Sequence, residues 1–168
     1  ETVAVIEAML AAKARGATLG AIVNTPHSTL DRHVDIALHL RAGPEQCVLA
    51  TKSYTAKVAA LVLTAFACTG DAARGQAALE EAAGAIADLL TPSAMGDVAA
   101  LAASVATAEH LFVVGRGLAY PTALEAALKI KEASYIHAEG FAGGELKHGV
   151  IALVTDGTPC LVFAPDDA

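Results

Sequence analysis

Tryptophan is absent from the sequence, aromatic residues make up only 4% of it, and basic residues are few. The 11 Lys and Arg residues face 18 Asp and Glu residues, which gives a net charge of −7. Nucleic acids and anionic membrane surfaces attract the opposite charge balance, so we expect neither as a partner. Charged residues make up 17% of the chain and hydrophobic residues 55%, a composition that excludes a disordered chain and predicts a large buried core.

Long hydrophobic runs are also missing. A run such as residues 58–63 is far shorter than the roughly 20 residues that a transmembrane helix needs. The three cysteines, Cys47, Cys68 and Cys160, lie far apart and lack the spacing of a zinc site or a disulfide framework. We therefore expect a cytoplasmic protein without a metal site. Because residue 1 is Glu and residues 2–15 already predict a helix, we also expect an internal segment of a longer protein.

Helical and strand patterns alternate along the chain. Periodicity and turn residues predict helices at 2–15, 51–68, 76–90, 97–108 and 119–135, and strands at 18–23, 34–40, 111–114, 150–154 and 160–163. The helix at 51–68 is apolar on nearly every side, so we expect it to be buried. Strands that alternate with helices are typical of parallel sheets covered on both faces. The sequence therefore predicts an α/β fold of two incomplete units, joined near residues 70–96.

Three charged residues lie on one face of the predicted helix 119–135. Glu125, Lys129 and Glu132 are spaced i, i+4 and i+7 and span an arc of about 60°. Ala123 and Ala127 lie toward the opposite side. The spacing alone favours a solvent-exposed face with a Glu–Lys pair. The functional alternative is a carboxylate held beside an ammonium group at the mouth of a pocket, where it can move protons.

A glycine-rich stretch follows this helix at residues 140–144. Titratable residues within 137–148 surround it, and flexible backbone among such groups is more typical of a functional loop than of a connector. Glu145 and His148 have the Glu-x-x-His spacing of di-iron bundles, but the chain has no second such pair, so we expect no metal here. Residues 115–117, Gly-Arg-Gly, predict a strand-to-helix turn rather than a dinucleotide site, because the third glycine of that motif is absent.

Long stretches of the sequence resemble one family. They are GRGLAYPTALEAALKIKEASYIHAEGFAGGELKHG at residues 115–149 and AGPEQCVLATKSYTAKVAALVL at residues 42–63. Both are similar to the isomerase module of the glutamine–fructose-6-phosphate aminotransferases, also called glucosamine-6-phosphate synthases. That module consists of two sugar isomerase (SIS) domains. The resemblance implies flavodoxin-like parallel sheets with helices on both faces. Residues 1–70 would form the C-terminal part of the first SIS domain, and residues 71–168 the linker helices and the N-terminal part of the second.

The resemblance also implies roles for the charged helix face. Glu132 matches the base of the family, which carries a proton between C2 and C1 of the open-chain sugar. Glu125 and Lys129 match polar residues that accompany this base on the same face. His148 matches a histidine that assists ring opening and is often supplied by the neighbouring subunit, so the resemblance implies a homodimer.

Four further positions match substrate-binding positions of the family or lie beside one. Thr2 matches a hydroxyl that holds the sugar phosphate at a helix N-terminus, where free N–H groups attract anions. Val48 matches a position whose backbone lines the sugar pocket, and Ala50 and Thr51 lie close to it. The family's phosphate loop and Schiff-base lysine have no counterpart in this chain, so we expect the segment to be inactive alone.

As part of a full protein, the chain would help to make glucosamine 6-phosphate from fructose 6-phosphate and glutamine, with no metal or organic cofactor. Two alternatives stay open. One is a glucosamine-6-phosphate deaminase of the SIS type that lacks a glutaminase domain. The other is an SIS module that binds sugar phosphates within a regulatory protein. Such a module should lack the Glu132 and His148 pattern, and a shared fold alone does not decide between these functions.

Overall fold

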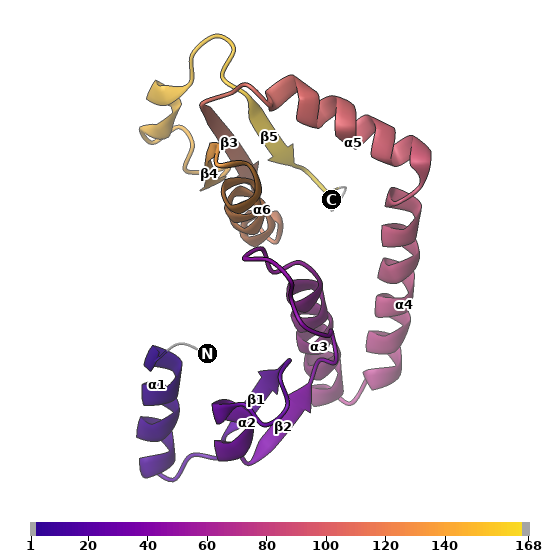
Figure 1. The fold of residues 1–168 in the computed structure, drawn as a ribbon, viewed down its shortest axis with the longest axis vertical. Helices are drawn as coiled ribbons and strands as arrows, with labels where there is room; N and C mark the ends of the chain where they lie inside the picture. The colour runs from indigo at the N-terminus through magenta and orange to yellow at the C-terminus, as the bar shows by residue number, and fades with distance from the viewer. Residues whose placement is uncertain (1–2, 166–168) are drawn as a thin grey trace. The chain divides into compact units, whose positions relative to one another are not determined.

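The computed structural model describes residues 3–165 (Figure 1). The chain divides between Ala87 and Asp88 into two compact units. Both units contain parallel strands joined by helices. The α/β class predicted from the alternating pattern is therefore confirmed.

The first unit is built around two parallel strands. Helix α1 (Val3–Ala14) precedes strand β1 (Gly20–Val23), and the short helix α2 (Thr29–His33) precedes strand β2 (Ile36–His39). The two strands pair from Gly20 opposite Ile36 to Val23 opposite His39. Helix α3 (Lys52–Cys68) and most of α4 (Ala72–Leu89) follow. The loop at residues 40–51 thus starts at the carboxyl ends of β1 and β2.

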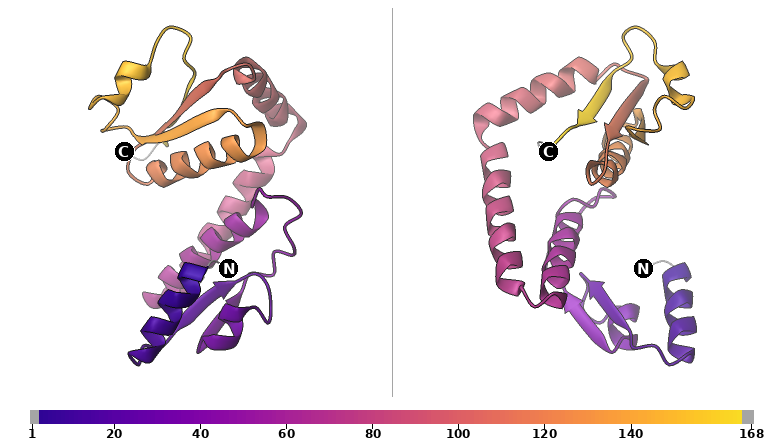
Figure 2. Two further views of the ribbon diagram at one scale, coloured as in Figure 1. Left: turned by 60° about the vertical axis from the view of Figure 1, so that its left-hand side comes forward. Right: turned by 180° about the vertical axis from the view of Figure 1, so that it is seen from behind.

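The second unit contains three parallel strands in the order β4–β3–β5. Its elements are α5 (Pro92–Val105), β3 (His110–Gly115), α6 (Ala119–Ser134), β4 (His137–Ala142), the 3-10 helix η1 (Val150–Leu153) and β5 (Cys160–Phe163). Helix α6 packs along β3 and β4, as both views in Figure 2 show. Its buried Ala123 and Ala127 form the core of this unit together with Leu111, Val113 and Ala138.

Two glycines allow α6 to lie close to the strands. A β-carbon at Gly115, the last residue of β3, would stand 2.1 Å from the carbonyl oxygen of Ala119. A β-carbon at Gly140 in β4 would stand 2.9 Å from the α-carbon of Leu124. Only glycine fits where backbones approach this closely. These contacts fix the position of α6 relative to its sheet, and with it the position of the charged residues on the opposite face of the helix.

The predicted elements agree with the observed ones except in four places, one of which is α2 (Thr29–His33), where the sequence predicts no helix. Residues 137–142, expected within a loop, form β4, which pairs with β3 along its full length. Its glycine and its polar residues lack the pattern of a strand. Residues 150–154 are expected as a strand, but residues 150–153 form η1, in which the amide of Ile151 bonds back to Leu146 and that of Ala152 to Gly149. Helix α5 begins at Pro92 rather than at residue 97, since proline suits the first turn of a helix.

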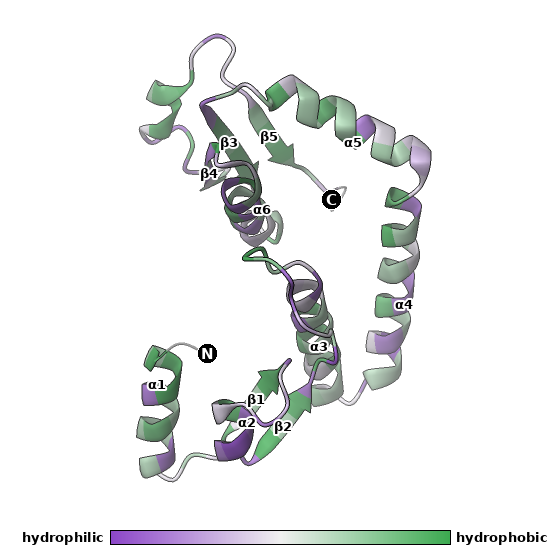
Figure 3. Ribbon diagram, viewed as in Figure 1, coloured by the Kyte–Doolittle hydropathy of each residue, from purple (hydrophilic) through white to green (hydrophobic). Residues whose placement is uncertain are grey.

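The expectation that the helix at 51–68 is buried is wrong for this structure. In α3, Val58, Leu61 and Leu63 are exposed, and Ser53 at the start of the helix is the buried residue. Figure 3 shows hydrophobic residues along β1, β2 and β3 alike. Apolar composition therefore does not by itself decide which elements are buried here.

No single helix among residues 3–165 is long and apolar enough to cross a membrane. Helices α4 and α5, bent by 69° at their junction, meet the length and composition criteria only as a pair.

Candidate functional site

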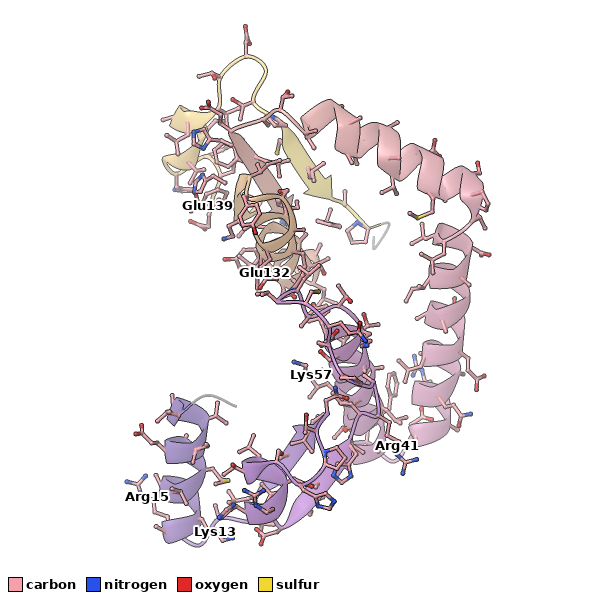
Figure 4. All side chains as sticks on the ribbon, viewed as in Figure 1. Lys13, Arg15, Arg41, Lys57, Glu132 and Glu139 are labelled. Atoms are coloured by element: carbon pink, nitrogen blue, oxygen red, sulfur yellow. The ribbon has the colours of Figure 1, made fainter. Side chains whose placement is uncertain are left out.

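The charged face of α6 is a compact ion-pair cluster. Lys129 Nζ lies 2.7 Å from Glu132 Oε2 and 3.3 Å from Glu125 Oε1. All three side chains are about three-quarters buried, with exposed fractions of 24% to 25%. Their i+3 and i+4 spacing places them on neighbouring turns of one helix face. The structure thus brings together the three charged residues that the sequence singles out on this helix. Figure 4 labels Glu132 on α6.

The two carboxylates keep the ammonium group of Lys129 charged. The pKa of Lys129 is raised above its ordinary value, chiefly by the hydrogen bond to Glu132 and also by Glu125, while partial burial acts in the opposite direction. A lysine with a raised pKa is a poor base, so the group in this cluster that can accept a proton is a carboxylate. Lys129 then serves to orient Glu132 through its Oε2 atom.

His148 lies in the turns that follow β4. The backbone of this segment is held by hydrogen bonds from Gly143 N–H to the carbonyl of Gly115, 2.8 Å, and from His148 N–H to the carbonyl of Glu145, 2.9 Å. The side chain of His148 is exposed, and within residues 3–165 it forms no ion pair with the α6 cluster. The imidazole of His148 is therefore accessible from solvent.

The predicted substrate-binding residues of the first unit lie on the loop between β2 and α3. Val48 is 90% exposed and Ala50 is half-buried. Thr51 is the N-cap residue of α3, but its hydroxyl makes no capping hydrogen bond. Thr2 lies outside the described residues. Three of the four predicted positions thus share one segment of the loop that starts at the carboxyl end of β2, the edge at which open parallel sheets bind ligands.

Two polar residues that the sequence analysis missed hold this loop. Glu45 Oε1 accepts a hydrogen bond from Ser53 N–H, 2.8 Å, and so supplies the cap that Thr51 does not. The side-chain amide of Asn24 bonds to the backbone of Ala42 and of Gly43. The pKa of Glu45 is lowered, chiefly by its hydrogen bonds from Ser53, and Lys52 contributes. The partners are 8 to 19 residues apart in sequence, so no local pattern reveals them.

Each unit has a cavity at the carboxyl ends of its strands. One of about 490 Å³ lies at the end of β1 and is lined by Ile22, Val23, Asn24, Thr25, Ser28 and Leu30. Another, of about 500 Å³, lies at the ends of β3 and β5 and includes residues 115–117. Both have the size of small-molecule sites. Within residues 3–165, no group of three or more His, Cys, Asp or Glu side chains is placed to hold a metal ion.

Comparisons with known proteins match the chain to one family. The model of the SIS domain matches residues 1–67 and 104–168. The glutamine–fructose-6-phosphate aminotransferase [isomerizing] of Halobacterium salinarum is 42% identical over 176 aligned residues, which cover all of this chain and 29% of that protein. The enzyme of the same name from Mycolicibacterium smegmatis is 43% identical over 173 residues, covering 98% of this chain and 27% of that protein.

A solved structure gives the same result. The C-terminal domain of glucosamine-fructose-6-phosphate aminotransferase from Francisella tularensis superimposes with a TM-score of 0.86 at 34% identity, covering 99% of this chain and 49% of that one. The chain spans less than a third of the length of the curated relatives named above. The resemblance inferred from residues 42–63 and 115–149 is confirmed, and the chain belongs to the SIS domain family.

Proposed function

We propose that this chain is part of the isomerase domain of a glutamine–fructose-6-phosphate aminotransferase. The full enzyme converts fructose 6-phosphate and glutamine to glucosamine 6-phosphate and glutamate. The observation that carries the proposal is the Glu125–Lys129–Glu132 cluster on α6. The whole of this chain aligns at 42% identity with part of an enzyme of that name. A regulatory sugar-binding module would have no need of a proton-transfer group held in this way.

In the proposed reaction, Glu132 moves a proton between C1 and C2 of the open-chain sugar. Lys129 holds the Oε2 atom of Glu132 at 2.7 Å and so orients the carboxylate for the transfer, and Glu125 holds Lys129 from the other side. Positioned carboxylates of this kind accelerate proton transfer by about 10²–10⁴-fold. His148, supplied by the neighbouring subunit of a homodimer, assists opening of the sugar ring.

Substrate binding is assigned to the first unit. Thr2 contacts the phosphate group, and Val48, Ala50 and Thr51 line the sugar. We assign residues 1–70 to the first SIS domain, and residues 71–168 to the linker helices and the second SIS domain. The reaction uses no metal or organic cofactor, and the enzyme is a cytoplasmic homodimer that binds sugar phosphates rather than nucleic acid or membranes.

The test is the conversion of fructose 6-phosphate and glutamine to glucosamine 6-phosphate by the full-length protein. The substitution Glu132→Gln keeps the shape of the side chain but removes its basicity, so kcat should fall about 10³-fold with little change in KM for the sugar. Glu80→Gln, which changes an exposed carboxylate on α4, is the matched control and should leave both constants unchanged.

Three results would contradict the proposal. Glucosamine 6-phosphate that is consumed with release of ammonia, without any use of glutamine, would identify a deaminase. Binding of the sugar phosphate without turnover would identify a regulatory module. A Glu132→Gln variant that keeps most of its turnover would remove Glu132 from the role of base.

A further inference from the structure

The loop between β2 and α3, residues 40–51, contains no helix or strand of its own. It nevertheless carries Val48, Ala50 and Thr51, the positions assigned to the sugar. With Val48 90% exposed, packing cannot define the conformation of this part of the loop. Its conformation depends instead on hydrogen bonds to side chains at its two ends.

Asn24 holds the beginning of the loop. Its Oδ1 atom accepts a hydrogen bond from Ala42 N–H, 2.9 Å, and its Nδ2 atom donates one to the carbonyl of Gly43, 2.7 Å. On this turn Arg41 has φ 55°, in the left-handed region that residues other than glycine rarely adopt without support, and Gly43, with φ 74°, adopts the same region at little cost. Asn24 directly follows β1, so the turn is tied to the end of the neighbouring strand.

Glu45 holds the other end of the loop. Its carboxylate accepts the hydrogen bond from Ser53 N–H, 2.8 Å, in the first turn of α3, where helical N–H groups otherwise lack partners. Ser53 is 6% exposed, so an unpaired N–H at this position would be shielded from water. The lowered pKa of Glu45 agrees with a carboxylate that stays charged at this helix end. Residues 46–51 are thereby clamped between Glu45 and the helix that it caps.

We propose that Asn24 and Glu45 are positioning residues, which hold the loop at residues 40–51 in the conformation in which Val48, Ala50 and Thr51 contact the sugar phosphate. This rests on the proposed function, since the substrate is the one assigned there. In this proposal both residues act through the loop and move no proton, although the side chain of Asn24 also lines the cavity at the end of β1. Their loss therefore weakens substrate binding and leaves the chemical step on Glu132 nearly unchanged.

The experiment combines steady-state kinetics with amide hydrogen exchange on the full-length protein. Asn24→Ala and Glu45→Ala should each raise KM for fructose 6-phosphate about tenfold and change kcat less than about threefold. Exchange should become faster at the Ala42 amide in Asn24→Ala and at the Ser53 amide in Glu45→Ala, because each substitution removes the acceptor of that amide.

Conservative variants separate positioning from a general loss of structure. Glu45→Gln keeps an oxygen that can accept from Ser53 N–H, so it should recover most of the lost affinity. Asn24→Asp keeps the acceptor for Ala42 N–H but loses the donor for Gly43, so its KM should lie between those of the wild type and Asn24→Ala; it also serves if Asn24→Ala fails to fold. Glu80→Gln is again the control and should change neither KM nor exchange.

Some outcomes overturn the proposal. An unchanged KM in both alanine variants does so, and so does a KM for Glu45→Gln as high as that of Glu45→Ala. If the unsubstituted protein makes no glucosamine 6-phosphate, the proposed function fails instead. Hydrogen exchange then tests separately whether Asn24 and Glu45 hold the loop. Unchanged exchange at Ala42 in Asn24→Ala and at Ser53 in Glu45→Ala would show that Asn24 and Glu45 do not hold the loop.

Discussion

Strands β2 and β3 have similar apolar sequences but opposite environments. In β2, Ile36 is 65% exposed and Leu38 44%, whereas in β3 every residue from Leu111 to Gly115 is buried. Strand β3 has a parallel neighbour on each side and α6 packed against it, while β2 pairs only with β1 among the described strands. The comparison shows that burial of a strand here depends on its neighbours rather than on its own hydropathy.

The largest effect is expected where α6 contacts β3. Gly115→Ala would place a β-carbon 2.1 Å from the carbonyl oxygen of Ala119, and since this oxygen belongs to the backbone, the helix itself must move. We expect a loss of about 4 kcal/mol in stability, measured as a fall in the denaturant midpoint of the full-length protein.

Gly20→Ala in β1 is the matched control in the other unit. A β-carbon at Gly20 meets nothing within 4 Å, so the stability should change by less than about 0.5 kcal/mol. Equal losses in the two variants would show that the close approach of α6 does not distinguish the units.

The second prediction compares two leucines in the two strands. Leu111→Ala in β3 removes a side chain that is 1% exposed and packs in the core of its unit, so it should cost about 3 kcal/mol. Leu38→Ala in β2 should cost less than about 1 kcal/mol, because that side chain already contacts water. Chemical denaturation measures both. A cost for Leu38→Ala as large as that for Leu111→Ala would mean that β2 is covered in the full-length protein.

The smallest effect concerns a polar contact of the first unit. The pKa of Asp31 is lowered from its ordinary value of 3.8, chiefly by the hydrogen bond from His27 N–H and also by the imidazole of His39, 2.8 Å away, while desolvation opposes the shift. A carboxylate with a lowered folded-state pKa stabilises the protein above its unfolded pKa and loses this contribution as the pH falls through the folded value.

Asp31→Asn should therefore lower the melting temperature at pH 7, and the difference from the wild type should shrink below about pH 4. Melting curves of the two proteins between pH 7 and pH 2 measure this. A difference that persists unchanged to pH 2 would show that the charge of Asp31 is not its source.

The sequence patterns predict the elements that rely on local periodicity. Four of the five predicted strands and all five predicted helices are present, because alternation of apolar residues and helix-forming runs is a property of neighbouring residues. Local periodicity also predicts the charged face of α6, since Glu125, Lys129 and Glu132 are neighbours on any regular helix.

Features that depend on distant partners escape this kind of prediction. Strand β4 is recognisable only through its pairing with β3 and the contact of Gly140 with α6, because its own sequence, HAEGFA, has neither an apolar run nor regular alternation. The bonds from Asn24 to Gly43 and from Ser53 to Glu45 join residues 19 and 8 positions apart, and no helix or strand periodicity predicts such pairs. The exposure of α3 likewise depends on what surrounds it rather than on its composition.

The close backbone contacts at Gly115 and Gly140 have a consequence for engineering. Because the inner face of α6 sets the spacing to its sheet, through the two glycines and through the packing of Ala123 and Ala127, changes confined to the outer face should leave the helix axis in place. A designer could thus replace Glu125, Lys129 and Glu132 with other reactive side chains, which would lie at the same distance from the strands. The two glycines would be the positions to leave untouched.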